Sequence, residues 1–301
     1  MASGVFKNLD FVGRWKLWFA LSAIFLLVSI GAIALGRLNF GIDFEGGSKF
    51  TASGLEGNPT TEEVREALPG NLGQDAVVQS LGEDGFEVRT PVLEPGQDAE
   101  VRDALAEELG AEVSVTSISP TFGGQIRSQA LQAVAAALII IVLFISIRFE
   151  FAFAIAAMLA LLHDILITVG FYALVGREVN LVTVVAVLTV LGYSLYDTII
   201  IFDRIRENTP EAGYNRRRFD AMANSSIRQV VMRSIYTSIC TLIPVAALLI
   251  FGESTLSDFA FALLVGIAAG TYSSIFIAAP ALALYKAWRA DRARKDAVKT
   301  A

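Results

Sequence analysis

The chain has 301 residues, of which 54% are hydrophobic and 18% charged, and its formal net charge is −6. Globular proteins are usually about 45–50% apolar, so this excess indicates a membrane protein. One histidine and one cysteine, Cys240, exclude a polyhistidine metal site and an intrachain disulfide; Cys240 lies in an apolar run and is predicted to be a buried thiol.

Six apolar stretches approach the roughly 20 residues that a membrane-spanning helix needs. They are residues 17–36, 128–147, 151–175, 181–202, 231–251 and 259–285. The first could be read as a signal peptide, because Ala32-Ile33-Ala34 mimics a cleavage site. Its apolar run is longer than a signal core of about 7–15 residues, so we interpret it as a retained anchor.

The charged residues are strongly segregated. Residues 37–127 hold 17 Asp and Glu against 6 Lys and Arg, whereas 17 of the other 18 basic residues fall on the side that holds both termini. The positive-inside rule makes that side the cytoplasm, so we predict a multi-pass protein of the cytoplasmic (inner or plasma) membrane with both termini inside. We expect an N-terminus and first span at 1–36, an extracytoplasmic domain at 37–127, spans two to six at 128–286 with a cytoplasmic loop at about 203–230, and a basic tail at 287–301.

The exported segment has the pattern of alternating strands and helices. Strands are predicted at 47–53, 75–81, 85–90 and 111–119, helices at 60–68 and 96–110, and a hairpin at "GEDG", residues 82–85. The order β-α-β-β-α-β suggests a small ferredoxin-like α+β domain. Its sequence holds no nucleophile triad, phosphate loop or metal cluster. We therefore expect it to bind or move rather than catalyse.

Two glycine pairs flank this domain. In "GIDFEGG", Asp43 and the pair Gly46-Gly47 indicate a turn into the first strand. At the other end, Gly123-Gly124 is predicted to form a flexible joint into the second span. Together these joints would let the outer domain swing.

A carboxylate lies inside the fourth span. Asp197 stands six residues before Asp203, where polar sequence begins, which is roughly 9 Å inside the apolar boundary. Such a group usually faces the bundle interior and marks an ion or proton path; a structural polar contact is the alternative. By helical spacing Tyr193 shares its face, Ser194 and Thr198 share a neighbouring face, and Gly192 would allow close helix approach.

Arg233, near the start of the fifth span, is the expected charge partner of Asp197, because both lie in the cytoplasmic half of consecutive helices. Thr237 and Ser238, one turn further, would hydrate or relay a proton; alternatively, Arg233 simply snorkels to the interface. His163-Asp164 interrupts the third span near its centre. We interpret that pair either as part of a hydrated path or as a hydrogen-bonded helix contact.

Several of these stretches resemble the SecF branch of the SecD/SecF family of bacterial and archaeal protein-export proteins. They are "GIDFEGG", "LLHD", "GYSLYDTIIIFDRIREN" and "NSSIRQVVMRSIYTS", in the family's order on a six-span plan. The family usually has Asn-Asp where this chain has Tyr196-Asp197, which leaves the carboxylate in place but changes the group beside it.

The resemblance implies a relative of the resistance–nodulation–division transporters that uses proton (or sodium) flow, with SecD, to drive late steps of secretion beside the SecY/SecE/SecG channel. It implies that Asp197 accepts the proton and that Arg233 is its charge partner. Expected partners are SecD, the channel, the exported preprotein and lipid; we expect no nucleic acid, no cofactor, no metal and no enzymatic activity.

Three other interpretations stay open at this point. Half of another proton-driven exporter would share the proton pathway. An intramembrane aspartyl protease would use the Tyr196-Asp197 pair, but needs a second carboxylate after a Gly-x-Gly pattern in the next helical region, which the sequence lacks. A pure assembly subunit would have no ion role.

Overall fold

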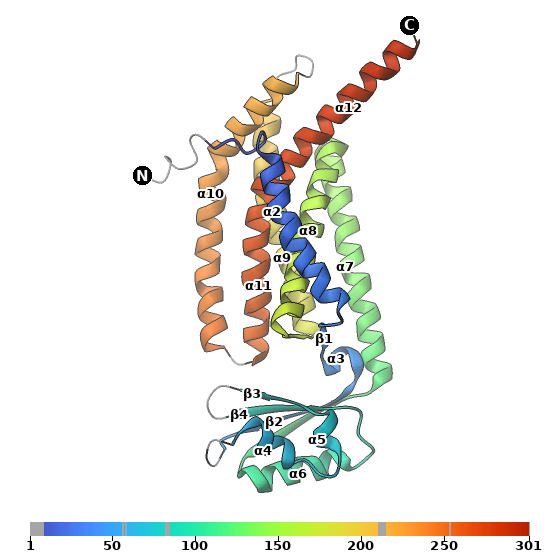
Figure 1. Ribbon diagram of the computed structural model, residues 1–301, viewed down its shortest axis with the longest axis vertical. Coiled ribbons are helices and arrows are strands. Elements are labelled where there is room, and N and C mark those ends of the chain that lie inside the picture. The colour runs from blue at the N-terminus through green and yellow to red at the C-terminus, as the bar shows by residue number, and fades with distance from the viewer. Residues whose placement is uncertain are drawn as a thin grey trace.

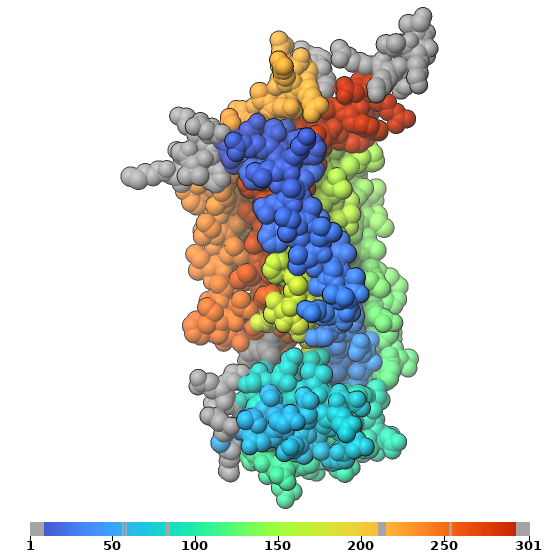
Figure 2. Space-filling view, viewed as in Figure 1, coloured from blue at the N-terminus to red at the C-terminus, as the bar shows by residue number. Residues whose placement is uncertain are grey.

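The computed structural model shows an elongated molecule with a helical bundle and a small α+β domain at one end (Figure 1). It describes residues 9–300 except 56, 58, 82–84, 210–214 and 253. We call the end of the bundle next to the small domain the domain end, and the opposite end, which carries the arginine-rich helix termini, the basic end. The space-filling view shows the domain apposed to the bundle (Figure 2).

Six helices of the described chain are long and apolar enough to cross a membrane, which confirms the six predicted spans. The first five are α2 (Trp15–Ala34), α7 (Pro120–Arg148), α8 (Phe151–Val175), α9 (Leu181–Glu207) and α10 (Arg216–Phe251). The sixth runs through α11 (Ser254–Ser273), a π-helical segment η1 (Ser274–Ala278) and α12 (Ala279–Thr300). Helix α8 is central, because 61% of its apolar window is buried, against 6% for α7.

The π-helical segment precedes Pro280. A proline ring clashes with the carbonyl four residues earlier and leaves that carbonyl without its N–H partner. Widening the backbone by one residue per turn relieves the clash, and such segments are frequent at functional sites. The widened turn begins at Ser274, beside Ser273, and both side chains are fully buried.

The small domain is built on a four-stranded antiparallel sheet of order β3-β4-β2-β5. Its strands are β2 (Gly47–Ser53), β3 (Val77–Ser80), β4 (Gly85–Thr90) and β5 (Glu112–Ile118). Its helices are α4 (Thr61–Glu66), the short α5 (Leu72–Asp75) and α6 (Gln97–Leu109). Phe50, Val64, Val88, Val101 and Leu105 are 0% exposed and form the core between sheet and helices.

Local sequence signals explain the ends of these elements. Thr60 caps α4 and exchanges hydrogen bonds with Glu63 in a capping box. Gly110, with φ of 59°, ends α6 in the left-handed conformation that glycine adopts without strain. The predicted strands and helices of this domain are confirmed to within a few residues; the predicted "GEDG" hairpin falls mostly on residues outside the described part.

The connection from α2 into the domain passes through β1 (Asn39–Phe40) and one helical turn, α3 (Ile42–Glu45). Strand β1 pairs in parallel with β6 (Glu178–Val179), between α8 and α9. Asp43 accepts a hydrogen bond of 2.9 Å from the backbone N–H of Leu181, the first residue of α9. The predicted turn residue therefore also satisfies a helix N-terminus.

Gly123 and Gly124, the predicted flexible joint, lie in the first turns of α7. Ser119 caps that helix and Pro120 occupies its first turn, so the helix begins eight residues before the expected span. A Cβ on Gly123 would approach the backbone of Gly46 and Phe44 within 3.1 Å, and one on Gly47 would approach the carbonyl oxygen of Thr90 within 2.5 Å. The two connections thus cross in backbone contact, and hinge motion there stays a prediction.

Two sequence expectations are wrong. A Cβ on Gly192 would meet no atom within 4 Å, so this glycine makes no close helix contact; Gly270 of α11 does, against Ser194. Cys240 is exposed on α10 rather than buried. An apolar sequence run does not distinguish a core-facing side from one that faces lipid or a partner, because both are apolar.

Candidate functional site

Asp197 lies in the bundle interior and is 1% exposed. Its Oδ2 atom has no hydrogen-bond partner among the described residues, and neither does the buried hydroxyl of Ser234. Ser234 and Arg233 of α10 are the polar groups that act on the Asp197 carboxylate. Buried polar atoms are nearly always paired, so a carboxylate oxygen without a donor marks a site that gains by taking up a proton.

Arg233 is exposed on the bundle surface and does not pair directly with Asp197. No hydrogen bond or ion pair within 4.0 Å joins these two described residues; instead, Arg233 Nη2 donates to the hydroxyl of Tyr196 at 3.2 Å. Tyr196 is 52% exposed. Tyr196 is therefore the side chain that fixes the Arg233 guanidinium.

A chain of hydroxyl groups runs from this region toward the domain end. Ser238 lies one turn from Ser234, and its Oγ is 2.6 Å from Thr271 Oγ1 of α11. Tyr193 Oη donates to Ser238 Oγ at 3.4 Å and accepts from Thr241 Oγ1 at 3.4 Å. These groups come from α9, α10 and α11, and they provide polar atoms through an otherwise apolar region.

Asp164 forms a second polar centre and is 0% exposed. Its Oδ2 accepts hydrogen bonds from Ser194 at 2.6 Å and from Ser273 at 2.9 Å. Its Oδ1 lies 3.0 Å from Nδ1 of His163, whose Nε2 lies 3.1 Å from Ser22 Oγ of α2. One carboxylate thus joins α8 to α9 and α11, and through His163 to α2.

The two centres meet along α9. Thr198 Oγ1 is 2.8 Å from Ser274 Oγ, which donates to the Ser194 carbonyl oxygen at 3.2 Å. Ser194 and Thr198 lie on either side of Asp197 in the sequence. A shift of α9 therefore moves the Asp197 carboxylate together with Ser194, which donates a hydrogen bond to Asp164.

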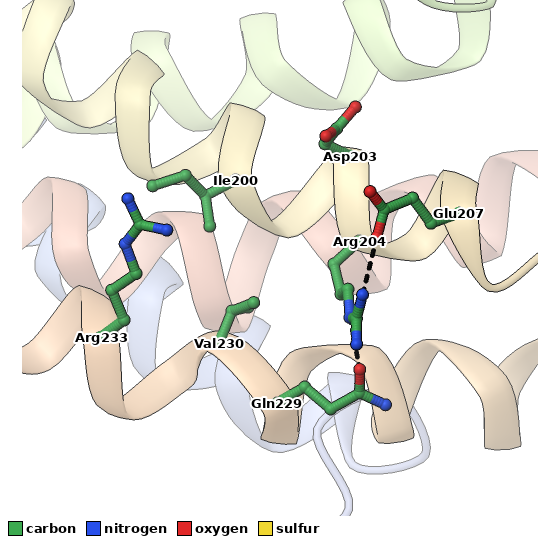
Figure 3. A pocket seen from close by; sticks show the side chains of 7 residues that line it. All are labelled: Ile200, Asp203, Arg204, Glu207, Gln229, Val230 and Arg233. Atoms are coloured by element: carbon green, nitrogen blue, oxygen red, sulfur yellow. Dashed lines mark hydrogen bonds and ion pairs between the residues drawn. The ribbon is translucent and has the colours of Figure 1, made fainter.

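Toward the basic end, a groove of about 290 Å³ lies between α9 and α10. Figure 3 shows Arg233 reaching from α10 toward Ile200 of α9, while Arg204 bonds to Glu207 and Gln229 nearer the basic end. The groove leads from the helix termini to Arg233. Charged groups next to Asp197 therefore border an opening at the basic end.

The structure brings most of the predicted site residues into two connected groups. Asp197 and Arg233 lie on facing helices, Tyr193 joins Ser238, and Ser194 joins Asp164 and His163. Thr237 instead bonds to carbonyl oxygens of its own helix at Arg233 and Ser234. Sequence reasoning missed Ser234, Thr271, Ser273 and Ser274, because serine and threonine are ordinary in membrane helices and often bond to their own backbone.

The sequence matches a known family of membrane proteins. The model of the family "Protein export membrane protein SecD/SecF, C-terminal" matches residues 101–288. A protein translocase subunit SecF of Desulfurispirillum indicum is 39% identical over 282 residues, covering 89% of each chain. The SecF of Streptomyces coelicolor is 37% identical over 91% of this chain and 76% of its own.

Two solved structures are also similar. The crystal structure of SecDF, a translocon-associated membrane protein from Thermus thermophilus, matches with a TM-score of 0.84 and 34% identity over 92% of this chain. A SecDF structure in a super-membrane-facing form matches with a TM-score of 0.70. The chain spans only 38% and 40% of those two SecDF chains, and 66% of the SecF of Mycobacterium tuberculosis.

Proposed function

This chain belongs to the SecD/SecF family of protein-export membrane proteins, and from that premise we propose that it is the SecF subunit that works with SecD to use a proton (or sodium) gradient for late steps of Sec-dependent translocation. The observation that carries the proposal is Asp197, a buried carboxylate with an unpartnered oxygen one helix away from an arginine.

Asp197 lies between the hydroxyl chain and the groove. A proton from the domain end passes along Thr241, Tyr193 and Ser238 to Asp197, and leaves through the groove that Arg233 borders. A charge that crosses the membrane releases about 2.3 kcal/mol per 100 mV. If fully coupled, that energy biases a two-state equilibrium about 50-fold.

Protonation changes the balance between α9 and α10. The ionised carboxylate attracts Arg233 across the helix pair, and the neutral acid releases it to Tyr196. The pair then repacks. Because Asp43 holds the first residue of α9, motion of that helix reaches the connection into the small domain. Movement of the domain is the step that acts on the exported chain.

The proposal includes the surroundings of the protein. The basic end faces the cytoplasm and the domain end faces outward in the cytoplasmic membrane, in keeping with the positive-inside rule. Partners are SecD, the SecY/SecE/SecG channel and the preprotein. The boundaries at 37–127 and 128–286 separate an outer domain from the bundle; the strand order and the flanking helices support a ferredoxin-like fold for the former.

The test replaces Asp197 by asparagine in vesicles that contain SecD and the channel. Asp197→Asn should insert normally and lose the gradient-driven stimulation of preprotein translocation, because an amide cannot take up the proton. Asp220→Asn, a half-buried carboxylate near the start of α10 that does not line the groove, is the matched control and should keep the stimulation. Full stimulation in Asp197→Asn would remove this residue from the mechanism.

A further inference from the structure

A cluster of charged side chains joins the small domain to the bundle. Arg89 of β4 and Glu178 of β6 form an ion pair in which Nη1 and Oε2 are 2.9 Å apart. Their side chains are only 9% and 10% exposed. Arg89 belongs to the domain and Glu178 to the connection between α8 and α9, so this pair bridges the two parts of the molecule.

Two carboxylates converge on the one guanidinium. Glu87 Oε1 lies 3.8 Å from Arg89 Nε on the side away from the Glu178 contact, and Lys49 of β2 lies 3.5 Å from the other Glu87 oxygen. The other charged pair near Glu178 joins Arg177, which follows α8, to Asp258 of α11, with 2.5 Å between Nη1 and Oδ1. Glu178 therefore shares its strong cation with a second acid.

The backbone around Glu178 is hydrogen-bonded to the segment that leads from α2 into the small domain. Gly41 N donates to the Val179 carbonyl oxygen at 2.9 Å, and the Asn39 amide donates to that of Gly176 at 2.9 Å. A Cβ on Gly41 would come within 2.0 Å of Glu178 Oε1. Glycine at this position of "GIDFEGG" thus leaves room for the carboxylate to reach Arg89.

A cleft of about 1020 Å³ opens beside the pair, between the polar face of the sheet and the domain end of the bundle. Its lining includes Lys49, Glu87, Glu178, Arg177 and Asp258. Although the pair is nearly buried, its carboxylate borders a large polar space. Protons from the aqueous phase at the domain end therefore have a direct route to Glu178.

We propose that Arg89 and Glu178 form a proton-sensitive clamp, which docks the small domain on the bundle firmly while Glu178 carries a proton and weakly when Glu178 is ionised. The neutral acid still accepts a hydrogen bond from the guanidinium, and it no longer repels Glu87. The ionised acid must be desolvated in the docked state beside a second carboxylate.

The direction of the pKa shift of Glu178 agrees with a clamp that is tighter at low pH. Burial, the largest effect, raises the pKa of Glu178 from 4.5 to about 7, against the opposing influence of Arg89. A group whose pKa is higher when docked than when released strengthens docking fully below the released value of 4.5, and that contribution is lost progressively as the pH rises to about 7. The docking equilibrium should change by at most about two orders of magnitude across this range.

The clamp does not depend on the proposed role of Asp197, since its contacts all lie at the domain end. It adds a response to the pH of the aqueous phase there, separate from proton flow through the bundle. An experiment on the full chain can therefore separate the two ideas.

Distances between spin labels test the clamp in the full chain reconstituted in lipid nanodiscs. Cys240→Ser gives a cysteine-free background, and Glu108→Cys on α6 with Phe251→Cys on α10 place labels on the domain and on the bundle. Both native side chains are exposed, and Phe251 is 86% exposed. Distance distributions are recorded from about pH 4 to about pH 8, a range that brackets both pKa values of Glu178.

The docked distance should predominate at low pH and give way to a longer, broader distribution with a midpoint between 4.5 and about 7. Glu178→Gln, which resembles the protonated acid, should stay docked throughout, and Arg89→Gln should be released more at every pH. Arg102→Gln, which removes the exposed Arg102–Asp103 pair of α6, should behave as the unchanged chain.

A distribution that does not change with pH would overturn the clamp, and so would a Glu178→Gln variant with the original response. Should Arg89→Gln fail to fold, Glu178→Gln still decides, because it keeps the shape of the side chain. Asp197→Asn should keep the pH response; its loss there would assign the response to the membrane carboxylate instead.

Discussion

At the scale of single residues, the contact between Tyr196 and Arg233 determines where the guanidinium lies. A hydrogen bond to a charged group contributes about 1.5–3 kcal/mol when buried, and less here because Tyr196 is 52% exposed. This hydrogen-bond energy is still enough to decide between two positions of the Arg233 side chain. Tyr196 thus holds Arg233 apart from Asp197 while that carboxyl group is protonated, and ionisation of Asp197 shifts the balance toward the carboxylate.

Tyr196→Phe tests that role. The variant keeps the ring and removes the acceptor, so Arg233 should move toward Asp197 and favour its ionised form. Protonation then needs a higher proton concentration, and half-maximal stimulation of translocation should shift to lower pH, with insertion unchanged. Tyr236→Phe, one turn beyond Arg233 and 54% exposed, is the control. An unshifted pH profile in Tyr196→Phe would contradict the role.

The sequence predicts the two charged members of this site but not their contacts. Asp197 and Arg233 are conspicuous because ionisable side chains are costly in apolar helices. Ser234 and the hydroxyl of Tyr196 are not conspicuous, since neither is unusual in such a helix. Which of them faces the carboxylate depends on the rotation of α10 against α9, and that is set by packing across the whole bundle.

At the scale of helices, α2 crosses α8 in close contact. A Cβ on Gly170 would lie 2.1 Å from Ser29 Cβ and 2.5 Å from its Cα. These two backbones approach so closely because both positions carry small residues, and this packing fixes α2 on the central helix. His163 and Ser22 lie on the same pair of helices, so the crossing also positions the Asp164 group.

Gly170→Ala should therefore destabilise the bundle by about 1–3 kcal/mol, because backbone must move to admit the methyl group. Gly192→Ala is the matched control on α9: its Cβ meets no atom within 4 Å, and the change should be neutral or stabilising by up to about 1 kcal/mol. Thermal unfolding in detergent measures both. Equal stability of the two variants would show that the α2–α8 contact is looser than described.

Hydropathy predicts the number of spans because it is a property of each segment alone. It does not predict that α7 begins at Pro120, that Gly270 rather than Gly192 meets a neighbouring helix, or that the sixth span widens at Ser274. The start of α7 depends on capping by Ser119, the glycine contact on how α9 and α11 cross, and the widened turn on Pro280. None of these is a property of one segment's hydropathy.

At the scale of the whole molecule, the face of α10 that carries Arg233 is not covered by any of the residues that the structure describes. Arg233, Tyr236 and Cys240 are all exposed, and Cys240 lies seven residues, or two turns, beyond Arg233. An arginine is costly against lipid, so this face is where a second membrane protein should pack. In the proposed function that protein is SecD.

Association with SecD should then shield Cys240. Labelling of the native thiol by a membrane-permeant maleimide should slow severalfold when SecD is present. A cysteine introduced by Leu131→Cys in a Cys240→Ser background lies on α7, where the native leucine is 68% exposed, and should label at the same rate with and without SecD. If SecD protects position 131 and leaves Cys240 reactive, the partner packs on α7 instead.

The overall plan of the molecule could largely be predicted, and the way its two parts are joined could not. Alternating strands and helices between two spans indicate an exported domain, as charge segregation does. The pairing of β1 with β6 and the bond from Asp43 to α9 join residues about 140 positions apart, and short polar segments leave no periodic pattern. Docking is therefore visible only in the folded chain.

The most direct test of the central claim is the protonation of Asp197 itself. Difference infrared spectroscopy of the reconstituted Glu178→Gln protein, in which the clamp carboxyl is absent, recorded on acidification, should show a carboxylic acid C=O band that shifts in deuterium oxide. That band should be absent in Asp197→Asn and kept in Asp203→Asn. If no such band appears, or if it persists in Asp197→Asn, Asp197 does not take up the proton that the mechanism requires.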